Sequence, residues 1–462
     1  MSLAAIRGTI LGIVALTAEP PSLLPTVQTE ETVYSYLPAD NGAGPMWCMG
    51  ATCIVRDGAE VFISGVETLR DREPLNNVRW VLYRRAATGW EVVALDSSGF
   101  TREPCPLAVL PGSNTLLLSA NPTLVPDQLA GPASPQMLVF DTEDPESGYD
   151  VELPVWQGEP PFTEHSYRSL AVDGPGQEVA LFNILAYERY HWSLRDSNGV
   201  WSESGELVFP WEDDYPEPRH VRLCYPEIVL KARACHFLGI SDIIEPYPEW
   251  RAYKKELTGR DWDYDFRRLF YTWTPDLARE PFRGWLEVAS RDETAGWING
   301  LDLHVDENGD AHLFWRERST DERMQDKFFP DTPLTYSLHH GVVRDGELIL
   351  SEVLEIGGEG HGEVIPGAGR LQVTPDGRMF LFYYAGGTDD DGERVSENRV
   401  MEVYPGGGHS EAVRVDLQHP FTSFFTATPR SGSEPSNAID IYGVATGVPE
   451  PHTLRYARIM LQ

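Results

Sequence analysis

Short polar turns, each followed by a hydrophobic run of strand length, recur seven times along the chain. They begin at Asp57-Gly58, Gly112-Ser113-Asn114, Asp173-Gly174, Tyr225-Pro226, Glu307 to Asp310, Pro375 to Gly377 and Ser431 to Asn437. The starts lie roughly 55 to 80 residues apart, a period typical of propellers and solenoids. A polar, glycine-containing turn between two apolar runs indicates a β-hairpin. The pattern therefore predicts seven repeated β units.

A second hairpin follows in most units, for example RWVLYRR and WEVVALD on either side of residues 86–89. Helical periodicity is nearly absent, the one candidate lying around residues 250–257. Repeated four-stranded units predict an all-β fold, a single seven-bladed β-propeller over residues 1–462. The expected blades lie near residues 45–96, 103–154, 164–210, 220–290, 297–356, 365–417, and 422–462 plus 5–17.

Both ends of the chain are apolar and strand-like. Residues 6–17 read IRGTILGIVALT, and the chain ends with LRYARIMLQ. A propeller closes its ring when one terminus completes the blade begun by the other, which removes an exposed sheet edge. We expect residues 5–17 to join the last blade in this way. No signal peptide is evident, because the charged start is a lone Arg7 and no clean small-residue cleavage site follows.

The charge of the chain limits its partners. Among 462 residues, 37 are basic and 71 acidic, a formal net charge of −34. Such a surface repels nucleic acid and anionic membranes, and no apolar stretch is long enough to span a bilayer. We expect neither partner. An anionic ligand would need a locally basic pocket inside this acidic shell. We expect a secreted or periplasmic monomer, and the sequence leaves a cytoplasmic location open.

The longest loops all fall on one face of the predicted ring. They are residues 65–77 in blade one, 241–265 in blade four and 318–333 in blade five. Loops on a rigid scaffold carry function more often than the scaffold does. We therefore expect the functional site on this face, over the central channel.

Ionisable and aromatic residues gather at the starts of the innermost strands on that face. On alternating positions of one strand, His165 and Tyr167 share a side and Arg168 takes the other. Blade four adds Arg222 and Tyr225, the next loop of blade three adds His191, and the equivalent place in blade six adds Arg370. Convergent ionisable groups at one rim predict a binding or catalytic cleft.

Arg, Tyr and His together suit one type of reaction. Arg captures a carboxylate with two parallel hydrogen bonds, and Tyr or His can remove the acidified proton beside it. That combination predicts β-elimination from a uronic acid in a poly- or oligosaccharide. A glycoside hydrolase would instead use a carboxylate pair, for which Glu164, Glu188, Glu227 and Asp302 are candidates. A non-catalytic carbohydrate-binding propeller would show exposed tryptophans, such as Trp47, Trp297 and Trp315.

The sequence predicts no cofactor outright. A structural Ca²⁺ ion at residues 389–393 and a Zn²⁺ ion held by His165, His191 and His236 stay open as alternatives. Neither stretch has a complete metal-binding motif. Nucleotide-binding fingerprints are also missing from the sequence.

Four segments resemble a known group of propellers. They are HSYRSLAVD (165–173), RLCYPEIVLKARACHFLGISDIIEP (222–246), WDYDFRRLFYTWTPD (262–276) and IPGAGRLQVTPDGRMFLFYYAGG (365–387). Over about residues 45–445 the chain resembles the BNR-4 group of sialidase-like seven-bladed propellers. That group is similar to the propeller polysaccharide lyases, including ulvan lyases of families 24 and 25 and lyases of rhamnosyl-glucuronate linkages.

The resemblance implies roles for particular residues. His165 and His191 look like the histidine pair of those lyases, and Tyr225 looks like their catalytic tyrosine. The arginine is not fixed: Arg233 follows Tyr225 too closely for the family pattern, so Arg222, Arg251 or Arg370 could take its place. The sialidase Asp-box is missing from the chain.

Overall fold

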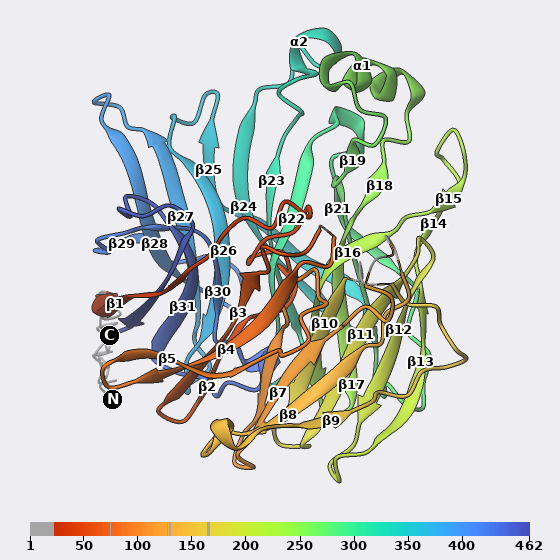
Figure 1. The fold of residues 1–462 in the computed structure, drawn as a ribbon. Helices are drawn as coiled ribbons and strands as arrows, with labels where there is room; N and C mark the ends of the chain where they lie inside the picture. Colours follow the sequence, from red (N-terminus) through yellow and green to blue (C-terminus); the bar gives the residue numbers. More distant parts are fainter. Residues whose placement is uncertain (1–22, 74, 127, 129–130, 164–166) are drawn as a thin grey trace, which may run out of the picture.

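The protein is a ring of seven four-stranded antiparallel sheets around a central axis (Figure 1). The computed structural model describes residues 23–462 except 74, 127, 129–130 and 164–166. The prediction of an all-β, seven-bladed propeller is confirmed. In blades one to six the strands follow the chain order from the axis outward, as expected of consecutive hairpins.

The strands of the first three blades are as follows. Blade one contains β2 (Ile54–Asp57), β3 (Glu60–Thr68), β4 (Val78–Ala86) and β5 (Gly89–Leu95). Blade two contains β6 (Leu107–Leu110), β7 (Thr115–Ala120), β8 (Gln136–Asp141) and β9 (Asp150–Glu152). Blade three contains β10 (Arg168–Asp173), β11 (Glu178–Leu185), β12 (Arg189–Arg195) and β13 (Trp201–Val208).

The remaining four blades complete the ring. Blade four contains β16 (Leu223–Lys231), β17 (Ala234–Ser241), β20 (Arg268–Thr274) and β21 (Leu286–Ser290). Blade five contains β22 (Trp297–Val305), β23 (Ala311–Arg318), β24 (Thr335–Arg344) and β25 (Glu347–Gly358). Blade six contains β26 (Ile365–Val373), β27 (Met379–Thr388), β28 (Arg394–Val403) and β29 (Val413–Val415). Blade seven contains β30 (Phe421–Thr426), β31 (Ala438–Ala445), β32 (Thr453–Met460) and β1 (Thr26–Ser35).

Six of the seven polar turns identified in the sequence join the first and second strands of their blades. In blade four the predicted turn is wrong: Tyr225-Pro226 lies within β16, and Ala232 and Arg233, both with a positive φ, form the turn between β16 and β17. In blade one, Asp57 pairs with Glu60 across the turn, and Gly58 has a φ of 56°. Glycine adopts this left-handed conformation without the steric cost that a side chain would bring. The turn residues thus fix the register of each inner hairpin, and the hydrophobic alternation fixes which faces become buried.

An N-terminal strand closes the ring, although it is not the expected segment. β1 pairs antiparallel with β32 and becomes the outermost strand of blade seven. We expected residues 5–17 in this place, and those residues lie outside the described part of the chain. Tyr34 of β1 joins the last blade to the first, since its hydroxyl accepts hydrogen bonds from Tyr442 Oη at 3.1 Å and from the backbone N–H of Val66 at 3.1 Å.

The core consists of apolar layers between neighbouring blades. Between blades three and four, for example, the ring of Phe237 lies 5.9 Å from that of Phe182 and 5.4 Å from that of Tyr190. All three side chains are buried. Because strand side chains alternate between faces, each inner strand contributes to two such layers.

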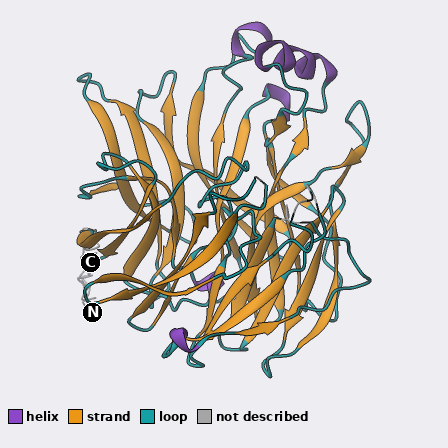
Figure 2. Cartoon of the chain, viewed as in Figure 1, coloured by secondary structure: helices purple, strands orange, loops and turns teal. Residues whose placement is uncertain are grey.

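Two small accessory sheets and two helices extend one face of the ring. The sheets are β14 (Trp211–Glu212) with β15 (Arg219–His220), and β18 (Ile243–Ile244) with β19 (Tyr264–Asp265). The helices are α1 (Pro248–Thr258) and α2 (Gln325–Phe328), which lie together at the top of Figures 1 and 2. Among the described residues, no helix is both long and apolar enough to cross a membrane.

A short segment, residues 46–51, fills the channel at the axis, and we call it the plug. Arg370 Nη2 of blade six donates to the Met49 carbonyl at 2.8 Å, and Arg430 Nη1 donates to the Gly50 carbonyl at 3.1 Å. Ser169 of blade three also donates to the Gly50 carbonyl, at 3.4 Å. A Cβ on Gly50 would lie 2.3 Å from the backbone of Tyr225, so only glycine fits here.

We expect loss of the Tyr34 hydroxyl to weaken the closure of the ring. Tyr34→Phe leaves the Val66 N–H and the Tyr442 hydroxyl without their acceptor, which should cost about 1–3 kcal/mol of unfolding free energy. Tyr36→Phe is the matched control on the same segment, and it should cost much less. Urea denaturation of the three proteins would measure the difference, and equal losses in both variants would contradict it.

Candidate functional site

A cavity of about 710 Å³ opens on the face that carries the long loops. Its walls come from the starts of β16 and β22, from the long segment between β17 and β20 in blade four, and from the loop between β23 and β24. Three predicted site residues line it: Tyr167, Arg222 and Tyr225. The cavity therefore lies on the face where we expected the functional site, and it covers blades three to five.

Tyr225 owes its position to the proline that follows it. Pro226 has no N–H to donate, and the register of β16 with β17 shifts between Cys224 and Glu227. At this bulge Tyr225 has a φ of 48°, a conformation uncommon for a bulky residue. Backbone strain of this kind clusters at functional sites. The bulge turns the Tyr225 side chain into the cavity.

The floor of the cavity is an ion pair surrounded by tyrosines. Arg222 Nε donates to Asp242 Oδ2 at 2.9 Å, and Arg222 Nη2 contacts the same oxygen. The Arg222 guanidinium lies 4.4 to 5.7 Å from the centres of three rings, those of Tyr187, Tyr167 and Tyr264. Cation–π contacts of this kind hold the guanidinium in one orientation. The sequence analysis missed Tyr187, which lies in the short turn between β11 and β12, and Tyr264, which lies in the long loop of blade four. The sequence does not show that these two segments converge in three dimensions.

Hydrogen bonds link the floor to Tyr225. The Tyr167 side chain is hydrogen-bonded to both the Asp242 carboxylate and the Tyr225 side chain. The Tyr167 and Tyr225 rings lie 4.9 Å apart, and Trp47 of the plug packs edge-on against Tyr225 at 6.2 Å. Burial raises the pKa of both Tyr167 and Tyr225, so both hydroxyls are protonated at neutral pH. Burial also raises the pKa of Asp242, against the opposing effect of Arg222.

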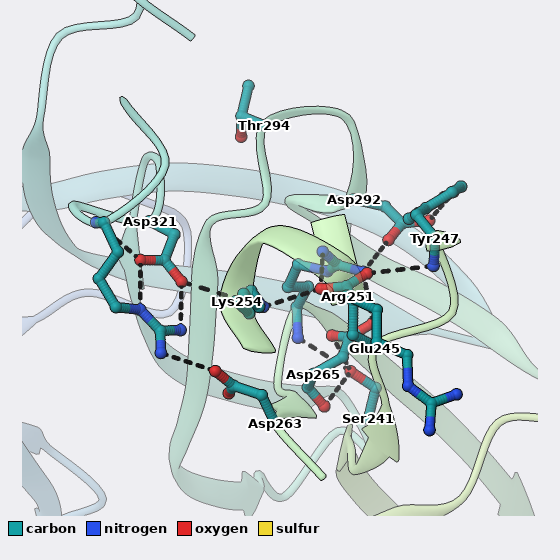
Figure 3. A network of polar contacts seen from close by, with 12 residues as sticks. Ser241, Glu245, Tyr247, Arg251, Lys254, Asp263, Asp265, Asp292, Thr294 and Asp321 are labelled. Carbon is teal, nitrogen blue, oxygen red and sulfur yellow. Dashed lines mark hydrogen bonds and ion pairs between the residues drawn. The ribbon is translucent and has the colours of Figure 1, made fainter. Parts of the chain in front are cut away.

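Helix α1 forms one wall of the cavity. Pro248 occupies its first turn, and Gly259, with a φ of 71°, ends it by donating its N–H to the Lys255 carbonyl. Lys254 points back toward the propeller, where its Nζ donates to Glu245 Oε2 at 2.8 Å (Figure 3). Lys254 is buried, and it also approaches Asp321 of blade five at 3.9 Å.

A buried arginine completes this network. Arg267, which is 2% exposed, donates to Glu245 at 3.1 and 3.2 Å and to Asp265 at 2.8 Å, and it pairs with Asp292 at 3.1 Å. Because these charges are paired and hydrogen-bonded, the free-energy cost of burying them is largely offset. Removal of one partner would leave the remaining charges buried without compensation. The network fixes α1 as a rigid wall.

The lining is basic, unlike the protein as a whole. Seven cationic side chains line the cavity against four acidic ones: Arg102, Arg222, Lys254, Arg260, Arg267, Arg318 and Arg323, against Asp242, Asp263, Asp265 and Asp321. Several of these cations form ion pairs with the acidic residues of the lining, as Arg323 does with Asp321 and Asp263 at 2.6 Å. In a chain of net charge −34, this is the local reversal of charge that an anionic ligand requires.

Three tryptophans add flat apolar surface to the lining. They are Trp47, Trp262 and Trp297. Trp262 was missed, although at 57% exposure it is the most open of the large aromatic side chains. Trp315 was expected at the mouth and is instead buried, with its indole N–H bonded to Glu317 at 2.6 Å. Period-two alternation explains the difference, because Trp315 faces blade four while its neighbours Phe314 and Arg316 face blade six.

Of the two predicted histidines, one lies within the described part of the chain. His165 lies outside it. His191 lies on β12, the third strand of blade three, where it is buried against Phe162 at 5.7 Å. Burial lowers its pKa, and neither ring nitrogen has a hydrogen-bond partner. His191 does not line the cavity, so the histidine pair implied by the resemblance stays a prediction.

The other predicted arginines already have protein partners. Arg168 donates to the carbonyls of Pro104 at 3.0 Å and Ser119 at 3.3 Å, which anchors blade three to blade two. Arg370 lies at the axis and donates only to backbone carbonyls. Arg251 is exposed on α1 and donates to the Asp261 carbonyl at 3.3 Å. Among the predicted arginines, Arg222 alone lines the cavity.

Two of the carboxylates considered for hydrolysis lie at the axis below the plug. Asp302 pairs with Arg430 at 2.8 Å, and Glu227 is 1% exposed. Burial, opposed by Arg430 and Arg370, raises the pKa of the Glu227 carboxyl to about 8. Neither carboxylate lines the cavity, so they do not form a catalytic pair there.

The expected metal alternatives find no support in the described residues. Nowhere among them do three or more His, Cys, Asp or Glu side chains gather closely enough to hold an ion. Asp389 instead accepts the backbone N–H groups of Asp391 and Glu393 in a hairpin turn. His236 bonds the Tyr271 hydroxyl at 2.7 Å within blade four.

Neither a protein-family model nor a curated protein sequence matches the chain, so membership of the BNR-4 group stays a prediction. Solved structures with a similar fold include the α-L-arabinanase of Penicillium chrysogenum, with 13% identity and a TM-score of 0.45 over 94% of this chain and 98% of that one. Another is the apocarotenoid oxygenase of Synechocystis, with 11% identity and a TM-score of 0.40 over 92% and 88%. A third is the Aleuria aurantia lectin, with 9% identity and a TM-score of 0.37 over 78% and 94%. These likenesses concern the fold alone.

The buried Glu227 predicts a distinctive pH dependence of stability. Between its ordinary pKa of 4.5 and its folded value of about 8, the folded chain keeps a proton that the unfolded chain releases. The contribution of Glu227 to stability is therefore complete below pH 4.5 and falls as the pH rises toward 8. Glu227→Gln cannot titrate, so its stability relative to the wild type should rise across this window by up to a few kcal/mol, at about 1.4 kcal/mol per pKa unit.

Urea denaturation at pH 5.5, 6.5 and 7.5 would measure this difference. Glu217→Gln is the control, because the Glu217 side chain is 85% exposed. It should follow the wild type at every pH. Parallel pH profiles for Glu227→Gln and the wild type would show that Glu227 ionises normally in the folded chain.

Proposed function

We propose that the protein is a carbohydrate-active enzyme, a lyase that cleaves a uronate-containing poly- or oligosaccharide by β-elimination in this cavity. The observation that carries the proposal is the hydrogen-bonded series Tyr225–Tyr167–Asp242, which opens on a cation-rich pocket. It offers a proton acceptor and donor beside groups that attract a carboxylate.

The series accounts for the proton transfers of β-elimination. A neutral tyrosine accepts a proton only if it gives up its own at the same time. The Tyr225 oxygen would take the C5 proton of the uronate, pass its proton to Tyr167, and Tyr167 would protonate Asp242. The C5–H electron pair forms the C4–C5 double bond, and the C4–O bond breaks. The leaving oxygen then takes from Tyr225 the proton that came from C5, and Asp242 returns its proton through Tyr167 to Tyr225, which restores the starting state. The products are an unsaturated uronate and a sugar with a free hydroxyl group.

Arg222 stabilises the charge in this reaction. It faces the cavity beside Asp242, and it has the fork geometry that suits a carboxylate. Neutralising the substrate carboxylate acidifies the C5 proton. The same cation stabilises the deprotonated Asp242 before the reaction begins.

A non-catalytic carbohydrate-binding propeller is the second candidate, favoured by the three tryptophans in the lining. Sugar rings stack on such surfaces without chemistry. A glycoside hydrolase is less well supported, because Asp242, Asp265 and Asp321 are each paired with an arginine.

The lyase proposal is tested by incubating the protein with uronate polymers and following near-ultraviolet absorbance. Product with an unsaturated uronate should accumulate, and Tyr225→Phe should lower kcat about 100-fold or more, because it removes the proton-transfer group. Tyr149→Phe is the control, since Tyr149 lies on blade two, away from the cavity, and should retain full activity.

The other outcomes separate the alternatives. Sugar release without near-ultraviolet absorbance would contradict the lyase and favour hydrolysis. Binding of uronate saccharides without any cleavage would favour the non-catalytic propeller. Full activity in Tyr225→Phe would remove Tyr225 from the mechanism.

A further inference from the structure

One guanidinium beside the cavity has no acceptor among the described residues. Arg316 lies on β23, and its Nε is buried without a hydrogen-bond partner. No ion pair or hydrogen bond joins its guanidinium to the described part of the chain, and its only specific contact is with the ring of Trp297, 4.6 Å from the Arg316 Cζ. An unpaired, largely desolvated charge is costly, and in folded proteins such groups normally have a partner.

The surroundings of Arg316 are cationic. Burial, together with Arg370 and Arg318, lowers its pKa to about 10, and no carboxylate offsets these effects. The Nε of Arg318 is also buried without a hydrogen-bond partner, although its Nη1 reaches Glu322 at 3.2 Å. The positive charges of Arg370 and Arg318 both act on the Arg316 guanidinium, so negative charge is favoured beside it.

Strand register connects this cluster to the cavity. Trp297 pairs with Arg318 across β22 and β23, and Asn299 pairs with Arg316. Alternation places the four side chains on one face of blade five. Trp297 and Arg318 line the cavity, and Arg316 lies over the Trp297 ring. Arg316 does not itself line the cavity, but it is partly exposed and lies directly behind the Trp297 ring that does.

We propose that Arg316, with Trp297 and Arg318, forms a subsite for a carboxylate group on a sugar residue next to the one that reacts at Tyr225. This inference rests on the proposed function, and it identifies the substrate as a saccharide with at least two acidic groups. The Trp297 ring offers apolar surface to the sugar, while the guanidinium holds the carboxylate. The axis residue Arg370 does not serve this subsite, because it already donates to backbone carbonyls. Arg222 is assigned to the carboxylate of the reacting sugar and not to this one.

Calorimetric titration with trigalacturonate tests the subsite. The wild type should bind it, and Arg316→Gln should bind about tenfold more weakly or worse, since a hydrogen bond to a charged group is lost. Arg316→Lys, which keeps the charge without the fork, should fall between the two. Binding of D-glucuronate, which carries one carboxylate, should be weaker than that of trigalacturonate, and neutral maltotriose should show no dependence on Arg316.

A matched control separates this role from a general effect of charge. Arg378 also lies over an aromatic ring, 4.8 Å from Phe380, but it has Glu402 as its partner at 2.8 Å. Arg378→Gln should bind trigalacturonate as the wild type does. Without ligand, Arg316→Gln should unfold at a temperature equal to or above that of the wild type, because it removes an unpaired charge.

The outcomes distinguish this subsite from the lyase. Unchanged trigalacturonate binding in Arg316→Gln, no binding by the wild type, or a large loss of thermal stability in the free variant would each overturn the subsite. Arg316-dependent binding without unsaturated product would support the subsite and contradict the lyase. Unsaturated product together with binding that does not depend on Arg316 would support the lyase and contradict the subsite.

Discussion

The blades are joined at the axis of the ring by hydrogen bonds to one backbone segment, the plug. The plug presents the carbonyls of Met49 and Gly50 to the centre, where Arg370 and Arg430 donate to them. Gly50 lies so close to Tyr225 that a side chain would collide with it. Blades three, four and seven thus meet at one glycine, and blade six joins them through Met49. Asp302 balances the charge of Arg430 there, whereas Glu227, whose pKa burial raises, carries no charge while it stays protonated.

The same constraint shapes the site. The plug carries Trp47 against the Tyr225 ring, and the bulge that accommodates Gly50 turns Tyr225 into the cavity. On the far side, the paired charges around Arg267 hold α1 in place. The cavity is therefore rigid on both sides. A rigid cavity holds tyrosine hydroxyls at fixed positions, as proton transfer at carbon requires.

The sequence predicts the architecture well because turns and alternation are local properties. Each Gly-containing turn sets its own hairpin, and seven hairpins leave few arrangements other than a ring. The site depends on long-range packing, which alternation predicts only in part. Tyr167 and Tyr225 line the cavity, whereas Trp315 faces a neighbouring blade and Arg370 faces the axis. Arg316 could not be predicted, because nothing in a single sequence shows that a charged side chain lacks a partner in the fold.

The contrast between an acidic protein and a basic cavity follows from the range of electrostatic forces. At physiological ionic strength, charges are screened over about 8 Å, so the distant carboxylates of the surface hardly affect a ligand inside the cavity. The cations of the lining act at contact distance, and Arg316 does so without competition from a protein carboxylate. At low ionic strength the whole charge of −34 opposes the approach of an anion. Salt therefore has two opposed effects on this protein: it weakens the contacts within the site and lowers the barrier to reaching it.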